Sequence, residues 1–169
     1  MVKALDYNWD LPYAPQAMFE QGIRRDYIEA QAKTLSHYDL KLVALEDSPT
    51  GGRAVATYDI DIDLPTWARK MFPARAKVTE TRTWEGPAED GSRAYSFIVK
   101  IEQIPVEIRG TVGLNAKPDG TTHNTVNTTI KASIPVVGAK LEEMVATDLV
   151  KTIEGQRDFS ITWMRTQVR

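Results

Sequence analysis

The stretch KASIPVVGAKLEEMV, from Lys131 to Val145, changes its hydrophobic periodicity partway along. Up to Ile134, apolar and polar residues alternate as they do in a half-buried strand. After Gly138, the apolar residues return at the spacing of a helix. Because Pro135 cannot donate a hydrogen bond to a strand ladder, we predict that it ends the strand. Glycine adopts backbone conformations closed to other residues, so Gly138 is expected to allow the sharp turn into the helix.

The helix predicted for Ala139–Arg165 is the longest in the chain, and one of its faces is expected to pack on the strands. At about 3.6 residues per turn, this face contains Leu141, Met144, Val145, Asp148, Thr152, Gln156, Phe159 and Trp163. The opposite face is expected to contact solvent because it carries Glu143, Lys151, Glu154, Arg157 and Asp158. The polar residues Asp148, Thr152 and Gln156 in mid-face indicate a partly hydrated cavity. Alternatively, a small rotation places Asp148 at the edge, or Asp148 pairs with a strand residue.

Seven strands and two short helices are predicted before this long helix. The strands are Lys3–Leu11, Tyr38–Asp47, Arg53–Asp63, Arg75–Trp84, Arg93–Gln103, Val106–Leu114 and Thr121–Ile134. The short helices are Pro15–Gly22 and Asp26–Leu35, with Asp26 as the N-cap of the second. Short connections favour antiparallel pairing, and Pro105 indicates a sheet edge or a bulge. We predict an α+β fold in which a curved antiparallel sheet wraps around the C-terminal helix, because the sheet must bury one face.

Composition limits the function classes. The chain of 169 residues is expected to form one domain, residues 1–169, and its net charge of -2 argues against a nucleic-acid binder. The absence of cysteine excludes disulfides and thiolate metal sites. The first residues lack the apolar core of a signal peptide, and no apolar run approaches the ~20 residues of a membrane span. We therefore expect a cytosolic protein, and no motif indicates a metal or a cofactor.

Two sequence motifs and the order of the elements carry a resemblance to a known family. The motifs are DLPTWARKMF at Asp63–Phe72 and SIPVVGAKLEEMV at Ser133–Val145. They resemble the bacterial family called domain of unknown function 2505, within the START-like helix-grip (SRPBCC) superfamily. The resemblance implies a seven-stranded sheet wrapped around the last helix, with a cavity between them that often holds an apolar ligand. It implies no catalytic residue.

Two charged residues of the predicted strand Arg75–Trp84 are expected to point inward. Glu80 and Arg82 share a face with Val78 and Trp84, whereas lysine and threonine occupy the other face. Side chains two residues apart on one face are close enough to interact. The pair is expected either to form a structural ion pair near the rim of the sheet or to offer a charged contact to a ligand. Pairing of Arg82 with Asp148 is a third possibility.

The predicted cavity is lined by inward-facing strand residues and by the middle of the long helix. Its candidate residues are Tyr58, Ile60, Glu80, Arg82, Tyr95, Phe97, Val99, Ile108, Val112, Val126, Ile130, Met144, Asp148, Thr152, Gln156 and Phe159. Trp67, Met71 and Phe72 lie beside several cations and are candidates for a lid. The same segment could instead touch an anionic membrane surface or simply tuck against the core.

Three functions compete at this point. The first is binding of a hydrophobic or amphipathic small molecule, such as a lipid, isoprenoid or polyketide. The second is an enzyme of the cyclase or dehydratase type with Asp148, Glu80 or Tyr95 as acid or base. The third is a protein-interaction module with a filled core. Neither His37, in a predicted turn, nor His123, on a predicted outer face, is expected to take part.

Overall fold

One curved antiparallel sheet, covered on one face by helices, makes up the fold. The computed structural model describes residues 2–167. Its elements are β1 (Val2–Leu11), α1 (Pro15–Gly22), α2 (Arg25–Thr34), β2 (Tyr38–Ser48), β3 (Gly51–Asp61), β4 (Arg75–Glu85), β5 (Arg93–Ile101), β6 (Val106–Ala116), β7 (Thr122–Ala132) and α3 (Gly138–Gln167). The 7-stranded sheet has the order β1-β7-β6-β5-β4-β3-β2, and every neighbouring pair is antiparallel. The predicted fold class is confirmed.

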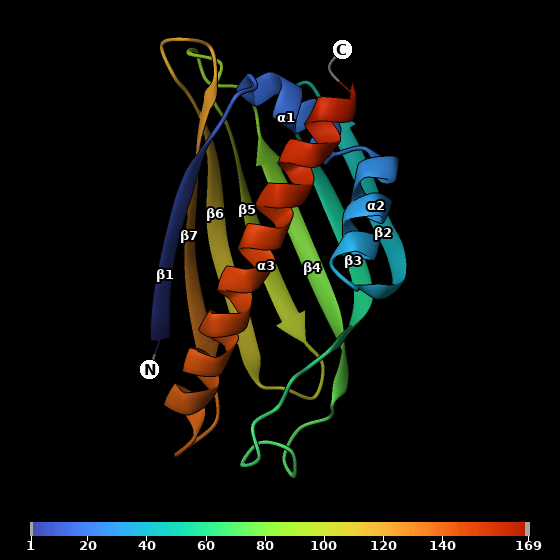
Figure 1. Cartoon of the computed structure of the whole chain (residues 1–169), viewed down its shortest axis with the longest axis vertical. Coiled ribbons are helices and arrows are strands. Elements are labelled where there is room, and N and C mark those ends of the chain that lie inside the picture. Colours follow the sequence, from blue (N-terminus) through green and yellow to red (C-terminus); the bar gives the residue numbers. More distant parts are fainter. Residues whose placement is uncertain (1, 168–169) are drawn as a thin grey trace.

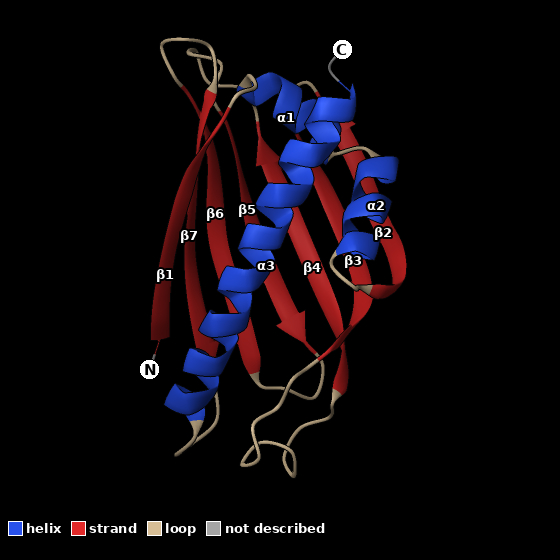
Figure 2. Ribbon diagram, viewed as in Figure 1, coloured by secondary structure: helices blue, strands red, loops and turns tan. Residues whose placement is uncertain are grey.

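The three helices lie on the same side of the sheet. In Figure 1, α3 runs diagonally across the sheet, with α1 near its C-terminal end and α2 beside β2 and β3. Figure 2 shows that the opposite face of the sheet carries no helix in the described part of the chain. The inner face is therefore the one that packs a core, as expected for a sheet that must bury one side.

The turn from β7 into α3 uses a different residue from the one predicted. The strand ends at Ala132, and the left-handed backbone conformation falls on Val136, with φ 69°, rather than on Gly138. A Cβ atom placed on Gly138 would meet no atom closer than 3.5 Å, so the position does not require glycine. Val136 is 99% exposed, so its side chain meets no packed neighbour while the backbone adopts this unusual conformation. The prediction for Gly138 was wrong.

Two further local predictions were wrong. Helix α2 begins at Arg25 with Arg24 as N-cap, while Asp26 lies in the first turn. The Asp26 carboxylate accepts a bond from the Tyr27 amide at 2.9 Å, so it still serves one free N–H of the helix start. Pro105 lies in the turn between β5 and β6, which are central strands, and neither an edge nor a bulge is found there.

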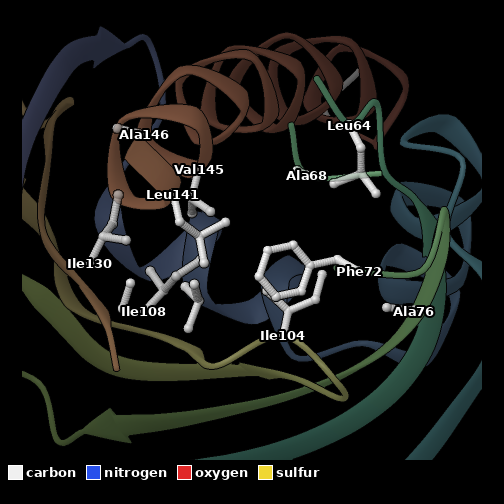
Figure 3. Packing of buried hydrophobic residues seen from close by; sticks show 12 residues of the cluster. Leu64, Ala68, Phe72, Ala76, Ile104, Ile108, Ile130, Leu141, Val145 and Ala146 are labelled. Atoms are coloured by element: carbon white, nitrogen blue, oxygen red, sulfur yellow. The ribbon is translucent and has the colours of Figure 1, made fainter. Parts of the chain in front are cut away.

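Buried hydrophobic residues form three clusters, one toward each end of the sheet and a small one between them with Val112, Val126 and Ile153. The lower core, at the lower end of Figure 1, contains Leu64, Ala68, Phe72, Ala76, Ile104, Val106, Ile108, Ile130, Ala132, Leu141, Val145 and Ala146. In Figure 3, Leu141 and Val145 point from α3 toward the sheet, and Phe72 points toward Ile104. The upper core contains Leu11, Met18, Phe19, Trp84, Leu114 and Met164. Each core is therefore built from strands together with helix or loop residues.

The flanks of α3 are more buried than the sequence predicts. Phe159 and Trp163 pack against the Tyr27 ring of α2, with ring centroids 5.2 and 5.6 Å from it. On the other flank, Tyr7 of β1 donates a hydrogen bond to Glu154 at 3.1 Å and accepts one from Arg157 at 3.1 Å. Glu154 and Arg157 are thus not purely solvent-facing residues. Because β1 and α2 cover both flanks, the helix has no simple division into a packed and an exposed half.

Candidate ligand-binding cavity

A cavity of about 360 Å³ lies between the inner face of the sheet and α3. All of the predicted cavity residues except two line it. Those that do are Tyr58, Ile60, Glu80, Arg82, Tyr95, Phe97, Val99, Ile108, Val112, Val126, Met144, Asp148, Thr152 and Gln156. Alternation along β3 to β7 brings the strand residues to one face, and the i, i+4 spacing of α3 adds Asp148, Thr152 and Gln156.

The two exceptions lie in other packed regions. Ile130 is 0% exposed and belongs to the lower core, where Figure 3 shows it beneath the first turns of α3. Phe159 lies on the flank of α3 that faces α2 and stacks edge-on against Tyr27. Their placement in the cavity was wrong because helix rotation and the depth of the lower core are not encoded in periodicity.

The predicted lid segment closes the lower end of the molecule without lining the cavity. Among the described residues around the cavity, none comes from Trp67, Met71 or Phe72. Phe72 is buried in the lower core, and Trp67 packs against that core. Met71 is 46% exposed. The segment is therefore part of the packed base below the cavity.

A charged pair lies in the cavity wall on β4. Arg82 Nε donates to Glu80 Oε1 at 2.5 Å, and the Tyr58 hydroxyl donates to Glu80 Oε2 at 2.9 Å. The side chains of Arg82 and Glu80 are only 19% and 14% exposed. The guanidinium carbon also lies 5.7 Å from the centre of the Tyr95 ring. The pair therefore sits inside the molecule, on the wall of the cavity, and the expectation of a rim position was wrong.

The protonation states of this group follow from its contacts. Burial alone would raise the pKa of Glu80, but the charge of Arg82 and the hydrogen bonds from Arg82 and Tyr58 lower it overall. Burial, followed by the charge of Glu80 and its hydrogen bond, holds the pKa of Tyr58 well above its ordinary value. At neutral pH the site thus contains a carboxylate, a guanidinium and a neutral phenol.

Asp148 lies apart from this pair. Its carboxylate is 3.8 Å from Lys151 on the outer side of α3, and the side chain is 49% exposed. Pairing with Arg82 is therefore not found. Partial burial is the main cause that raises the pKa of Asp148, Lys151 opposes the shift, and the charge of Asp63 adds to it. Asp148 is a half-solvated carboxylate at the boundary of the cavity.

His37 is a cavity residue that the sequence analysis missed. Its ring stacks on Tyr58 with centroids 4.0 Å apart and an interplanar angle of 5°. Burial lowers the pKa of His37, while the charge of Glu80 opposes this and that of Arg82 adds to it. Positive φ values at Ser36 and Asp39 shape the chain on both sides of it. Nothing in the hydrophobic pattern marks such a turn, so the sequence held no signal for this contact.

Helix α2 also contributes residues that a pattern could have revealed. Tyr27 and Gln31 at i, i+4 spacing, followed at the same spacing by the C-cap residue Leu35, all line the cavity. Gln31 donates to the Tyr27 hydroxyl at 3.4 Å, and that hydroxyl shares a 2.7 Å hydrogen bond with Ser160 of α3. The face of α2 that carries these residues is thus joined to the upper half of α3.

Within residues 2–167, no three His, Asp or Glu side chains gather in a way that could hold a metal ion. No helix in the same range is long and apolar enough to cross a membrane. The side chains that line the cavity offer apolar contact, aromatic stacking, hydrogen bonding and a buried ion pair.

Comparisons with known proteins agree on family and fold. A family model described as "Protein of unknown function (DUF2505)" matches residues 6–164. Uncharacterised proteins of Mycobacterium tuberculosis and Mycobacterium bovis are 25% identical over 178 residues, covering 99% of this chain and 100% of each relative.

Solved structures with low sequence identity share the architecture. Ara h 8.0201 matches with a TM-score of 0.60 at 14% identity, covering 98% of this chain and 99% of that one. TTHA0849 from Thermus thermophilus matches with a TM-score of 0.59 at 13% identity, covering 95% and 98%. Norcoclaurine synthase from Thalictrum flavum, in complex with dopamine and hydroxybenzaldehyde, matches with a TM-score of 0.58 at 9% identity, covering 100% and 89%. The fold is the helix-grip fold, which is known for ligand binding.

Proposed function

This chain belongs to the DUF2505 family, and we propose that it binds an amphipathic small molecule in the cavity between the sheet and α3. One observation carries the proposal. The cavity, of about 360 Å³, has mostly apolar walls that include a nearly enclosed ion pair. Small-molecule sites are typically apolar concavities of about 300–1,000 Å³ with a few convergent polar groups.

The apolar walls supply the favourable free energy of binding. Phe97, Val99, Ile108 and Val112 come from two neighbouring strands and present a continuous hydrocarbon surface. Each Å² of apolar surface removed from water contributes roughly 25 cal/mol. An elongated or ring-shaped apolar group placed against this surface would therefore gain several kcal/mol before the cost of immobilising it is subtracted.

The ion pair supports a ligand with a polar end. Replacing a buried ion pair by apolar residues of similar volume is often neutral or stabilising. Glu80 and Arg82 are thus a poor choice if the wall serves only to stabilise the fold. They suit a site in which a polar group of a ligand must be received inside an apolar cavity.

The structural neighbours give general support. The synthase of Thalictrum flavum holds two small aromatic molecules, and it shares the fold of this chain at 9% identity. That likeness concerns architecture alone, so neither its ligands nor its reaction is assigned to this chain. Small-molecule binding as a class is the part of the likeness that the cavity supports.

Binding can be tested with N-phenyl-1-naphthylamine, a neutral dye that fluoresces in apolar surroundings. We expect saturable binding of one dye per chain. In the blocking variant Thr152→Phe, an aromatic ring enters the cavity and dye binding should fall at least tenfold. Thr147→Phe is the matched control, because Thr147 is an exposed residue of the same helix. Both threonines donate their hydroxyl to the carbonyl four residues earlier, at 3.0 Å for Thr147 and 3.1 Å for Thr152.

The outcomes separate the three candidate functions. No dye binding by the folded protein, or equal losses in the two variants, would contradict the proposal and favour a module with a filled core. Native mass spectrometry of the freshly purified chain adds a second readout, since a small molecule bound in the cavity should co-purify with the protein. Conversion of that molecule during incubation would indicate an enzyme instead of a binding protein.

A further inference from the structure

Arg82 has a free end in the cavity wall. Its Nε is engaged by Glu80 Oε1, but its terminal nitrogens Nη1 and Nη2 donate to no acceptor within residues 2–167. Neither terminal nitrogen is among the sealed, unpartnered polar atoms of the described chain, so both reach open space. A guanidinium that is otherwise enclosed therefore keeps its outer edge, with its parallel N–H groups, available to a ligand.

The two oxygens of Glu80 are both occupied. Oε1 accepts from Arg82 and Oε2 accepts from Tyr58. Glu80 therefore holds Arg82 in place, and each of its two oxygens already accepts one hydrogen bond. A cationic head group entering here would meet the charge of Arg82 and a carboxylate already engaged at both oxygens, whereas an anionic head group would find two free donors.

A second, smaller space adjoins this position. A pocket of about 40 Å³ lies under α2 and shares Gly22, Gln31, His37, Tyr58, Glu80 and Arg82 with the main cavity. A single water needs roughly 10–15 Å³ of such volume, so the pocket is sized for a few water molecules or a small head group. Arg82 thus lies where the two spaces meet, beside the polar side chains of Gln31, His37, Tyr58 and Glu80 that line both of them.

We propose that the ligand is a carboxylate with an apolar body, bound through its two oxygens by Nη1 and Nη2 of Arg82. This inference rests on the proposed function. The planar fork of arginine matches a carboxylate in a bidentate geometry, and such charge-assisted bonds are about twice as strong as neutral ones. The apolar body then extends from Arg82 along Phe97 and Val99 into the main cavity.

The test compares three unbranched probes of ten carbons each that differ in their head groups. Decanoate, decan-1-ol and decylamine each compete with N-phenyl-1-naphthylamine for the unmodified protein. We expect decanoate to compete at a concentration at least tenfold below that of decan-1-ol, and decylamine to compete least well. Because one of its ten carbons is the carboxylate carbon, decanoate has one methylene fewer than the other two probes and gains less from apolar burial, so a preference for decanoate comes from its head group.

A charge-neutral double substitution places the effect on Arg82. In Glu80→Gln/Arg82→Met both charges are removed together, so no buried charge is left alone. The matched control is Glu107→Gln/Arg109→Met on β6, where a glutamate and an arginine have the same spacing but lie on the outer face, 33% and 57% exposed. The tenfold preference for decanoate should fall to about one in the first variant and stay unchanged in the second.

Each outcome has one meaning. If the dye binds and decan-1-ol displaces it as well as decanoate does, the carboxylate inference fails while the proposed function stands. Loss of the preference in the Glu107/Arg109 control as well would also overturn it. If neither the dye nor any probe binds, both the proposed function and the carboxylate inference fail. Should the Glu80/Arg82 variant not fold, the decanoate to decan-1-ol ratio of the unmodified protein still decides.

Discussion

Two glutamate–arginine pairs of equal spacing show what a single residue position can decide. Glu80 and Arg82 lie on the inner face of β4, whereas Glu107 and Arg109 lie on the outer face of β6. Alternation along each strand assigns the face, and the sequence analysis placed Glu80 and Arg82 inward on that basis. Alternation does not predict which residue of a neighbouring strand forms a hydrogen bond with Glu80. The hydrogen bond from Tyr58 depends on the register of β3 and β4, which pairs Tyr58 with Val78.

His37 carries a prediction about ionisation. Burial against Tyr58 lowers its pKa, and the attraction of Glu80 does not reverse the shift. In an NMR pH series, we expect the chemical shift of the His37 Cε1 proton to show a midpoint below the ordinary histidine pKa of about 6.5. Assignment follows from His37→Gln, which removes one of the 2 histidine signals.

The sign of this shift sets its effect on stability. Because the folded state binds the His37 proton less tightly than the unfolded state, stability falls as the pH drops from about 6.5 through the lowered pKa. His37→Gln should reduce that fall between pH 7 and pH 5. A midpoint for His37 at or above 6.5 would mean that Glu80 outweighs burial and that the stacked geometry holds a charged imidazole.

Asp148 carries a prediction of the opposite kind. Partial burial raises the pKa of Asp148 in the folded state. At a pH where the carboxyl is ionised, its charge is therefore less stable in the folded protein than in the unfolded chain. Asp148→Asn should leave stability at pH 7 unchanged or raise it by up to about 1 kcal/mol, small because the side chain is half exposed. The advantage should vanish as the pH falls below the ordinary value of about 3.9.

Urea unfolding at pH 7 and pH 3.5 measures this difference. Asp158→Asn is the control, since Asp158 lies on the same helix and pairs with Arg157 at 2.9 Å. That change should be neutral or slightly destabilising at pH 7. A loss above about 2 kcal/mol in Asp148→Asn would reveal a buried partner of the carboxylate.

At the scale of elements, the long helix shows where periodicity stops being informative. Its existence and its bounds were predicted to within two residues at either end. Its rotation was predicted less well, because β1 and α2 bury both flanks and make Phe159 and Glu154 parts of separate contacts. Hydrophobic periodicity predicts one buried face of a helix. Because α3 packs against the inner face of the sheet, β1 and α2, its buried residues are not confined to one face.

The junction before this helix gives a prediction at the same scale. Val136 adopts a left-handed backbone conformation, which costs a β-branched residue roughly 1–2 kcal/mol, and its exposed side chain makes up for none of it. Val136→Gly should therefore raise the free energy of unfolding by about 0.5–1 kcal/mol, after the greater freedom of glycine in the unfolded chain is subtracted. Chemical denaturation of both proteins measures the change.

Thr83→Gly is the matched control for that change. Thr83 is also exposed and β-branched, but it lies in the extended backbone of the central strand β4. Glycine relieves no strain there and weakens the strand, so a loss of about 1 kcal/mol is expected. Destabilisation of similar size in both variants would show that Val136 is not strained in solution.

For the whole molecule, the order of elements and the cavity's walls were predictable, and its boundaries were not. Alternation gave the strands, short connections gave the antiparallel sheet, and the final helix followed from the need to cover one face. The base of the cavity depends on how far residues 63–72 fold inward, which buries Phe72 and leaves Met71 exposed. The part of the cavity next to Glu80 and Arg82 depends on the α2–β2 turn, which brings His37 onto Tyr58. Both features depend on the conformation of loops, which no hydrophobic periodicity in the sequence predicts.

The cavity also links ligand binding to the stability of the whole chain. A ligand that binds only the folded state adds about 2.7 kcal/mol at 100 times its Kd. For a chain of 169 residues, 1 kcal/mol corresponds to roughly 2–4 °C in Tm, so saturating decanoate should raise Tm by about 5–10 °C. Thr147→Phe should show the same rise, whereas Thr152→Phe, with its cavity filled, should show almost none. An equal rise in both variants would place the bound molecule outside the cavity, and the side chain of Met71, which is 46% exposed, would then be the first surface to examine.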